Sequence, residues 1–252
     1  YKKTFLTGVV FRIDLAQPLS TSKKLITDFY EIIKGEFPNR EDISRVHFEA
    51  TMELAGKDQG AIKQTQRTVT SYRFNNADKK VVLMVEAEPP NLNLLFNEYN
   101  DSDKLNSLID LIVSAIKKIY GDVLIKRTGL RYIHNIRLEG DTFQWAPFIN
   151  PHLISLLDFL PEKRRISRGM GRIEISEDSY NVHFQFGMFN PEYPNPIARK
   201  EFILDYDCYM KEEIDVTNVP KIIENLHKAE KELFEKSITD ELRNVMGMIK
   251  HE

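Results

Sequence analysis

Hydrophobic and polar residues alternate along the first residues of the chain. Within residues 5–15, the apolar side chains of Val9, Phe11, Ile13 and Leu15 share one parity. Such alternation is typical of a strand that is buried on one face and exposed on the other. The chain is therefore expected to begin with a half-buried strand.

A helix, further strands and a second helix are predicted next. Apolar residues recur at helical spacing up to residue 33, after possible N-caps at residues 20–22 and before Pro38. Alternating segments then predict strands near residues 46–54, 68–74, 80–88 and 91–99. Residues 105–119 place apolar side chains on one helical face, and Gly121 ends that helix.

The second part of the chain repeats this order of elements. A long strand is predicted first, and Asn150 with Pro151 then begins a short helix. The strands predicted in this part span residues 123–138, 172–176, 180–189 and 201–210. Prolines exclude a strand in residues 190–200. Asn218 and Pro220 begin a long final helix, with a break expected near residues 237–240.

A repeated phrase supports an internal duplication. TGVVFRIDL at residues 7–15 is echoed by TGLRYIHNIRL at residues 128–138, and a repeat of this kind constrains the architecture. We predict an α+β protein of two similar β-α-β-β-β-α halves, residues 1–120 and 121–252, packed as one body with a pseudo-twofold axis. Consecutive strands should pair antiparallel, with the helices packed on one face of the sheets.

Composition narrows the classes of function. The 252 residues are 42% hydrophobic and 29% charged, with a formal net charge of -3, which describes an ordinary globular protein. This balance disfavours a nucleic-acid binder, which usually carries a basic excess. No apolar run is long enough to cross a bilayer, so no membrane partner is expected. Cys208 is the only cysteine, which excludes an intramolecular disulfide and suits a cytoplasmic protein.

Two motifs resemble a known family. Residues 125–136, IKRTGLRYIHNI, resemble the central signature of a sporadically distributed, largely uncharacterised family of prokaryotic proteins. The pattern FxxSITxxLR at residues 234–243 is similar to the closing motif of that family. The likeness extends over nearly the whole chain. It implies an accessory role, of the kind that defence or toxin–antitoxin genes have, and it assigns no catalytic residue.

Arginines form the sharpest candidate binding site. Arg127 and Arg131 share one parity of the long central strand, so their side chains should leave the same face of the sheet. Arg12, Arg73 and Arg172 lie on the strands expected to correspond. Converging guanidinium groups can hold phosphate or carboxylate groups bidentately. In the alternative, these arginines pair with Glu86, Asp205 and Asp207 on a solvated face, as antiparallel sheets often have one wet face.

Histidine and carboxylate residues complete the candidate ligand site. His183 and Asp205 are expected on adjacent strands, where they could contact a ligand or act as acid–base groups. Neither a metal nor another cofactor is predicted, because no metal-binding or phosphate-loop motif occurs. Cys208 lies on an apolar parity, which is typical of an inert buried thiol.

Aromatic residues and a strand edge are candidate contacts for partners. Phe143 and Trp145 lie in a predicted loop, where they either anchor a protein partner or fold under the sheet as part of the core. The strand at residues 91–99 is expected to be an edge that needs covering, which makes a homodimer plausible.

The sequence favours a non-enzymatic recognition protein that binds a protein partner or a small anionic ligand. One alternative is an enzyme acting on a phosphorylated or nucleotide substrate, although no nucleophile–base pair can be named from spacing. Another alternative is nucleic-acid binding by a curved, duplicated sheet.

Overall fold

The computed structural model describes residues 1–17, 23–53, 61–99, 102–158 and 162–247. It combines a large antiparallel sheet with helices, so the predicted α+β class is confirmed. The strands are β1 (Leu6–Leu15), β2 (Asn39–Glu53), β3 (Ala61–Asn75), β4 (Val81–Ala87), β5 (Pro90–Phe96), β6 (Leu124–Arg137), β7 (Gly169–Ser176), β8 (Asn181–Met188), β9 (Glu201–Met210) and β10 (Ile214–Asp215). The helices are α1 (Lys23–Ile33), α2 (Ser102–Tyr120), α3 (Pro151–Ile154), α4 (Val219–Ser237) and α5 (Asp240–Met246).

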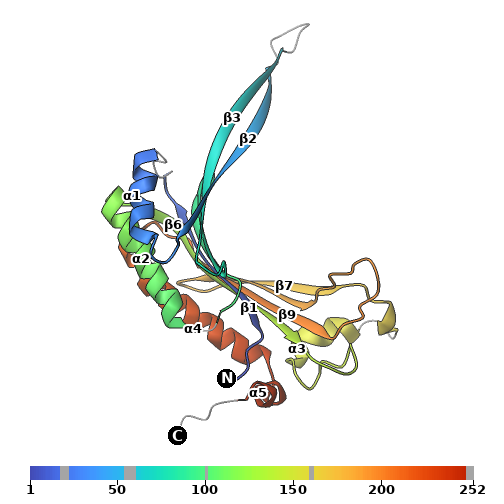
Figure 1. Ribbon diagram of the computed structural model, residues 1–252. Coiled ribbons are helices and arrows are strands. Elements are labelled where there is room, and N and C mark those ends of the chain that lie inside the picture. The colour runs from blue at the N-terminus through green and yellow to red at the C-terminus, as the bar shows by residue number, and fades with distance from the viewer. Residues whose placement is uncertain (18–22, 54–60, 100–101, 159–161, 248–252) are drawn as a thin grey trace.

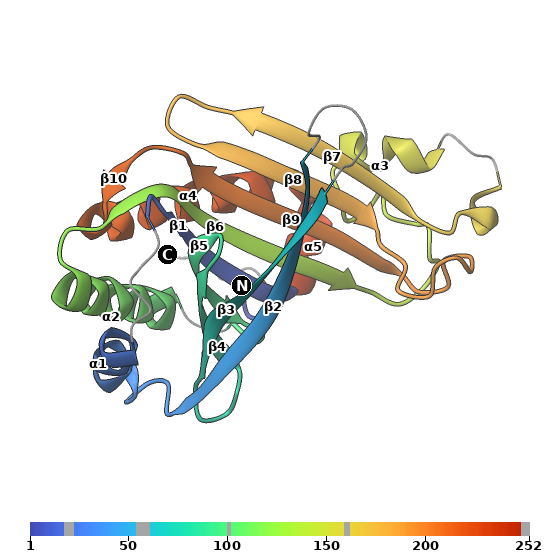
Figure 2. The same ribbon diagram turned by 90° about the horizontal axis from the view of Figure 1, so that it is seen from above.

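One sheet runs through the whole molecule. Its strand order is β2-β3-β4-β5-β1-β6-β9-β8-β7, with the short β10 also paired to β6. β1 and β6 lie side by side in the middle and pair antiparallel, and Figure 2 shows the other strands spreading to both sides of them. The sheet is therefore a single layer to which the first and second parts of the chain both contribute.

Helices α1, α2 and α4 cover one face of this sheet (Figure 1). The predicted apolar parity of β1, from Val9 to Leu15, is fully buried on that face. Burial of such apolar side chains is the main favourable contribution to folding. The alternation seen in the sequence therefore reports which side of β1 faces the helices.

The helices begin and end close to the predicted residues. Asn150 caps α3, since its side-chain oxygen accepts a hydrogen bond from the backbone N–H of His152 at 3.0 Å. Gly121 follows α2 with a φ of 76°, a conformation that glycine adopts without strain. The predicted break after α4 is confirmed, because Ile238 is extended and Thr239 is the N-cap of α5.

The hairpin of β2 and β3 extends beyond the rest of the sheet. β3 pairs with β2 over its whole length but with β4 only from Tyr72 to Asn75. The remaining part of the hairpin projects from the sheet, away from α4 and α5 (Figure 1). Residues 54–60, between these two strands in the sequence, lie outside the described residues.

Two details of the sequence prediction were wrong. The strand expected at residues 91–99 as an edge is β5, which pairs with β1 on one side and β4 on the other. The reason given for a homodimer is thereby lost. The strand predicted at residues 172–176 begins three residues earlier, at Gly169 of β7. A Cβ on Gly171 would lie 2.5 Å from the Phe186 ring, so close packing explains this glycine.

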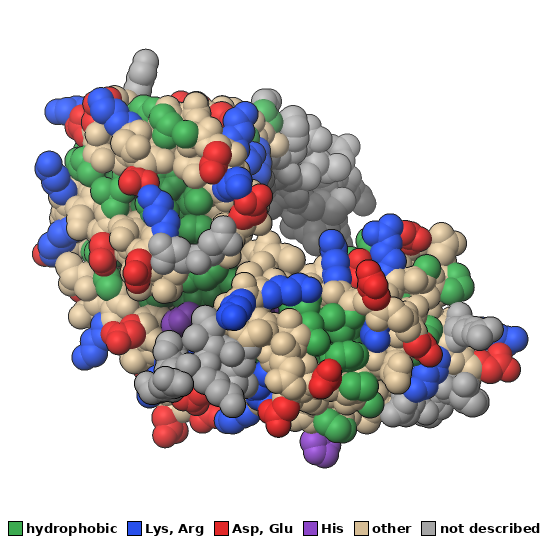
Figure 3. All heavy atoms as spheres, turned by 60° about the horizontal axis from the view of Figure 1, so that its bottom comes forward, with side chains coloured by type: hydrophobic (Ala, Val, Ile, Leu, Met, Phe, Trp, Pro, Cys, Tyr) green, Lys and Arg blue, Asp and Glu red, His purple; other side chains and the backbone are tan. Residues whose placement is uncertain are grey.

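The outer surface on the helix side of the sheet carries charges of both signs. Figure 3 shows Lys and Arg side chains interspersed with Asp and Glu, with hydrophobic side chains between them. Within the described part of the chain, no helix combines the length and the apolar character that a membrane crossing requires. We consider the opposite face of the sheet, which the helices leave uncovered, as the location of a candidate functional site.

We expect Phe11→Ala to lower the free energy of unfolding by about 3–5 kcal/mol, because it leaves a cavity beneath the helices. Urea denaturation of the purified chain measures this value. Val10→Ala on the same strand is the control, since Val10 is only half-buried on the other face and should cost less than about 1 kcal/mol. Equal losses in both variants would contradict the assignment of the two faces.

Candidate functional site

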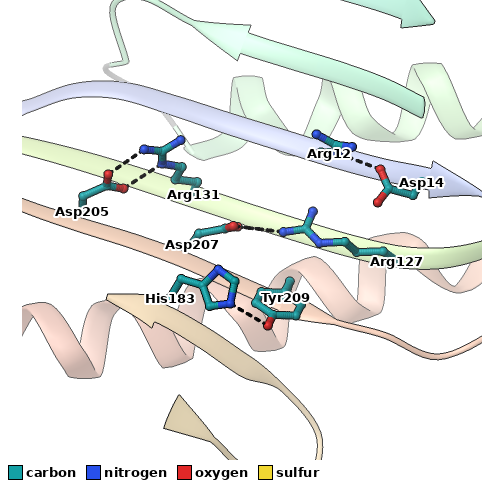
Figure 4. A network of polar contacts seen from close by, with 8 residues as sticks. All are labelled: Arg12, Asp14, Arg127, Arg131, His183, Asp205, Asp207 and Tyr209. Atoms are coloured by element: carbon teal, nitrogen blue, oxygen red, sulfur yellow. Dashed lines mark hydrogen bonds and ion pairs between the residues drawn. The ribbon is translucent and has the colours of Figure 1, made fainter. Parts of the chain in front are cut away.

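The central arginines lie on the face of the sheet that the helices leave open. Arg12 comes from β1, and Arg127 and Arg131 come from β6 (Figure 4). Their neighbours on β6, such as Leu130 and Tyr132, are buried on the opposite face. The side-chain period of two in a strand thus separates the arginines from the core. We refer to this surface as the open face.

Arg131 makes a bidentate ion pair with Asp205 of β9. Its Nε donates to Oδ1 at 2.7 Å, and its Nη2 donates to Oδ2 at 2.6 Å. The Asp205 side chain is only 10% exposed, whereas that of Arg131 is 43% exposed. The hydrogen bond to Asp205 raises the pKa of Arg131 above its usual value. The pair is therefore a fixed carboxylate covered by a partly accessible guanidinium group.

Arg127 lies flat on the sheet and contacts Asp207 and Tyr209 of β9. Its Nη2 is 3.1 and 3.0 Å from the two carboxylate oxygens of Asp207, and its Cζ lies 4.7 Å from the centre of the Tyr209 ring. Gly129 makes this position possible, because a Cβ there would lie 2.7 Å from Nη1 of Arg127. The conformation of Arg127 is thus fixed by a glycine, an acid and an aromatic ring.

The remaining arginines of the open face also have polar partners. Arg12 Nε donates to Asp14 at 2.7 Å, and Arg172 Nη2 donates to Glu174 at 2.6 Å. Further contacts of this kind join Arg73 to Asn75, Arg137 to Glu201 and Arg45 to Glu86. Of the pairs that the sequence left open as an alternative, those of Arg127 and Arg131 with Asp207 and Asp205 are present in the structure.

His183 lies beside these pairs but bonds to a different residue. It stands opposite Asp207 in the register of β8 and β9, and its Nε2 lies 2.9 Å from the Tyr209 hydroxyl (Figure 4). Of the predicted ligand residues, Arg12, Arg127, Arg131 and Asp205 lie on the adjacent central strands β1, β6 and β9, and His183 lies on the next strand, β8. Arg73 on β3 and Arg172 on β7 lie towards the two ends of the sheet.

His134 and Tyr132 belong to the covered face, where both side chains are buried. His134 Nε2 lies 3.0 Å from Glu230 of α4, and both side chains are buried. The Tyr132 hydroxyl lies 2.7 Å from Nδ1 of His227, also on α4. Burial raises the pKa of Tyr132 well above its usual value, so its hydroxyl stays protonated. These contacts join α4 to β6.

Trp145 is part of the core and is not an exposed anchor. It is 1% exposed, and its ring packs against Phe202 of β9. Phe143 is partly buried against the same cluster. The loop after residue 140 folds back because burying the indole removes a large apolar area from water. The prediction of a partner contact at Trp145 is corrected accordingly.

The sequence analysis missed an exposed aromatic cluster after β8. The guanidinium carbon of Arg168 lies 4.6 Å from the ring centres of both Phe189 and Tyr193. The two rings are 44% and 58% exposed. Aromatic and arginine residues of this kind are frequent in interface hot spots. A sequence signal existed in the aromatic residues of the proline-rich loop, but nothing in it showed that Arg168 lies between them.

The open face offers charged pairs and no evident reactive group. Among the described residues, no cluster of three or more His, Cys, Asp or Glu side chains could hold a metal ion. Asp205 and Asp207 are both bound to arginine.

A comparison of the sequence with protein-family models finds no matching family, and a comparison with curated proteins finds no match either. The resemblance of residues 125–136 to an uncharacterised family therefore stays a prediction. The geometry of the open face is the basis for any functional conclusion.

We expect a coupling of about 1 kcal/mol between Arg131 and Asp205, because the pair is bidentate but partly screened by water. The double-mutant cycle of Arg131→Gln, Asp205→Asn and the double variant measures it through urea denaturation. Arg165 and Glu162 form an exposed pair outside the sheet and provide the matched control cycle, with a coupling near zero expected. A coupling no larger than that of the control would contradict the fixed geometry.

We expect Cys208 to resist thiol reagents in the folded protein. It is fully buried, and burial raises the pKa of its thiol, so at pH 8 the thiol stays protonated and the reactive thiolate is suppressed. Modification by a chromogenic disulfide should be roughly a hundredfold or more slower than in the urea-unfolded chain, since it requires opening of the core. Rapid modification of the folded protein would contradict this placement.

Proposed function

We propose that this chain is a non-enzymatic recognition protein that binds a protein partner on its open face. The observation that carries the proposal is the ion-pairing of the central arginines, with Arg131 fixed on Asp205 and still 43% exposed. Fixed side chains lose little conformational entropy on binding, which favours their use as contacts. A sheet face without a helix over it also offers a broad surface.

Balanced charge favours a protein partner over an anion. Arg12, Arg127 and Arg131 each have an aspartate within ion-pair distance. A phosphate or nucleic acid would have to compete with these carboxylates, and phosphate binding normally requires an excess of positive charge. A protein surface with both signs can complement such a pattern, and complementary charges give specificity.

A small anionic ligand is a second candidate, supported by the arginine nitrogens that the acids do not use. Nη1 of Arg131 and the two Nη atoms of Arg12 have no hydrogen-bond partner in the described residues. These nitrogens come from neighbouring strands and the same face of the sheet. A carboxylate or phosphate ligand would accept single, not bidentate, hydrogen bonds from these nitrogens. The nearby aspartates weaken this candidate.

Catalysis is the less favoured alternative. His183 is hydrogen-bonded to Tyr209, and Asp205 and Asp207 are paired with arginine. Cys208 is buried under the helices. An enzyme would need a nucleophile with an adjacent base, and these groups are engaged in other contacts.

We also propose that the halves 1–120 and 121–252 are related by a pseudo-twofold axis between β1 and β6. Outward from β1 the strands are β5, β4, β3 and β2, and outward from β6 they are β9, β8 and β7, which is the same order along the chain. The central register supports this. If Gly8 of the first half is matched with Gly129 of the second, Arg12 is matched with Ile133. The ladder pair Gly8–Ile133 then corresponds to the ladder pair Gly129–Arg12, as a twofold axis between the strands requires. The β2 strand is then an addition to the first half.

The resemblance implies that the partner belongs to a defence or toxin–antitoxin system. We expect the chain, used as bait in an extract of its own host, to retain specific proteins that a variant with Arg131→Asp and Asp205→Arg loses. This exchange keeps an ion pair and the net charge while it inverts the pattern on the open face. Quantitative mass spectrometry of the retained proteins measures the difference.

The matched control exchanges Arg165 and Glu162 in the same way, outside the sheet, and should retain the same proteins as the unmodified chain. Identical retention by all three baits would contradict the use of the open face. Titration calorimetry with inorganic phosphate and with duplex DNA separates the other candidates, since tight binding of either would favour an anion or a nucleic acid over a protein.

A further inference from the structure

β7 is an edge of the sheet and, within the described residues, pairs with β8 alone. It is the last strand in the sheet order, and Figure 2 shows it as the outermost strand on its side of the molecule. The outward backbone groups of such a strand can pair with another strand. β7 also places Ile173 at the surface, where it is 44% exposed. An exposed apolar residue on an unpaired strand edge is a candidate contact for a binding partner.

The ladder of β7 and β8 determines which residues direct their backbone groups outward. At its turn, the N–H of Glu177 donates to the carbonyl of Tyr180 at 2.9 Å. The pairing from Ser176 to Gly169 then runs without a bulge, so hydrogen-bonded and non-hydrogen-bonded pairs alternate along it. Residues 171, 173 and 175 therefore bond to β8, and Arg172 and Glu174 direct their N–H and C=O groups away from the sheet.

The side chains along this edge are complementary to themselves. Arg172 and Glu174 stand on the open face, both more than half exposed, and Ile173 stands on the other face. If two copies of β7 pair antiparallel about Ile173, Arg172 of each copy lies opposite Glu174 of the other. Opposite charges in directly facing positions stabilise a sheet, and like charges destabilise it.

Neighbouring registers lack this match. Pairing about Arg172 sets two arginines opposite each other, and pairing about Glu174 sets two glutamates opposite each other. Pairing about any of these three residues joins outward backbone groups to outward backbone groups, but only pairing about Ile173 also opposes unlike charges and brings the two exposed isoleucines together. The exposed ion pair within one chain is weak, so its members can exchange partners without a large cost.

We propose that two copies of this chain associate through β7, in an antiparallel pair centred on Ile173 that continues the sheet across a twofold axis. The partner is a second copy, because the complementary charges and the apolar contact both belong to the same short strand. Arg127 and Arg131 remain uncovered on the central strands, so this association is separate from the recognition proposed for the open face.

Cysteine cross-linking tests the register directly. Residues at the centre of a non-hydrogen-bonded pair have Cα atoms about 4.5 Å apart, which is within the range of about 4.4–6.8 Å for a disulfide. Ile173→Cys should therefore form a cross-linked dimer under mild oxidation. Ile175→Cys is the control on the same face, since its two copies would lie about 13 Å apart at the rise of a strand. Cys208 is buried and does not interfere.

Charge exchange tests the partner. Glu174→Arg or Arg172→Glu should weaken self-association, measured by sedimentation velocity over a concentration series, about tenfold or more, because like charges then face each other. The double variant Arg172→Glu with Glu174→Arg should restore it. Glu224→Arg, on the exposed side of α4, makes the same charge change as Glu174→Arg and should leave self-association unaltered.

Three results would overturn the proposal. The first is an unmodified chain that stays monomeric at millimolar concentration. The second is cross-linking of the Ile175→Cys variant as fast as that of the Ile173→Cys variant. The third is a double charge variant that associates no better than the single ones. If the chain stays monomeric, the alternative is that the edge formed by β7 binds a different protein.

Discussion

The antiparallel ladder between β1 and β6 determines the rest of this structure. It joins the strands of residues 1–120 to those of residues 121–252 in one sheet, so a single pair of faces extends across the molecule. Phe11 faces Leu130 in this ladder, and both are buried beneath the helices. A shift of one residue in the register would place Arg131 under the helices and Leu130 in water. The cost of burying an unpaired charge excludes that arrangement.

A sheet with helices on one side has a second side that must remain compatible with water. In this protein that side carries arginines and acids in pairs, and the pairs of Arg127 and Arg131 cross from β6 to β9. Asp205 is nearly buried by its own arginine, whereas Arg131 keeps part of its guanidinium group accessible. The open face is thereby held in one conformation without helices above it. Such a surface suits the recognition of a large partner better than catalysis, which needs groups free to change their protonation state.

The two proposed binding regions use different parts of the sheet. The open face uses side chains of the central strands, where Arg127 and Arg131 are held by β9. The edge formed by β7 uses backbone groups together with Arg172, Ile173 and Glu174. The central strands are paired on both sides, whereas β7 is paired on one side and has backbone groups available for a new strand, as does β2 at the opposite end of the sheet. The strand order thus separates recognition from self-association.

Most of the secondary structure could be predicted from the sequence, because alternation and helical spacing are local. Val9 and Phe11 already reported the buried side of β1, and Asn150 and Gly121 marked helix ends. The parity of Arg127 and Arg131 likewise placed both on one face. The possible pairing of these arginines with Asp205 and Asp207 was recognised in advance as one of two alternatives.

The choice between those alternatives required the tertiary structure. β9 lies next to β6 although the two strands are far apart in sequence, as the Arg131–Asp205 separation of 74 positions illustrates. Strand order also made β5 an interior strand and left β7 as an edge. The burial of Trp145 and the stacking of Arg168 between Phe189 and Tyr193 depend in the same way on how loops fold back. The sequence by itself determined the elements and their faces, since these follow from local periodicity. Only the tertiary structure decided which faces and edges meet, because that choice depends on contacts between distant segments.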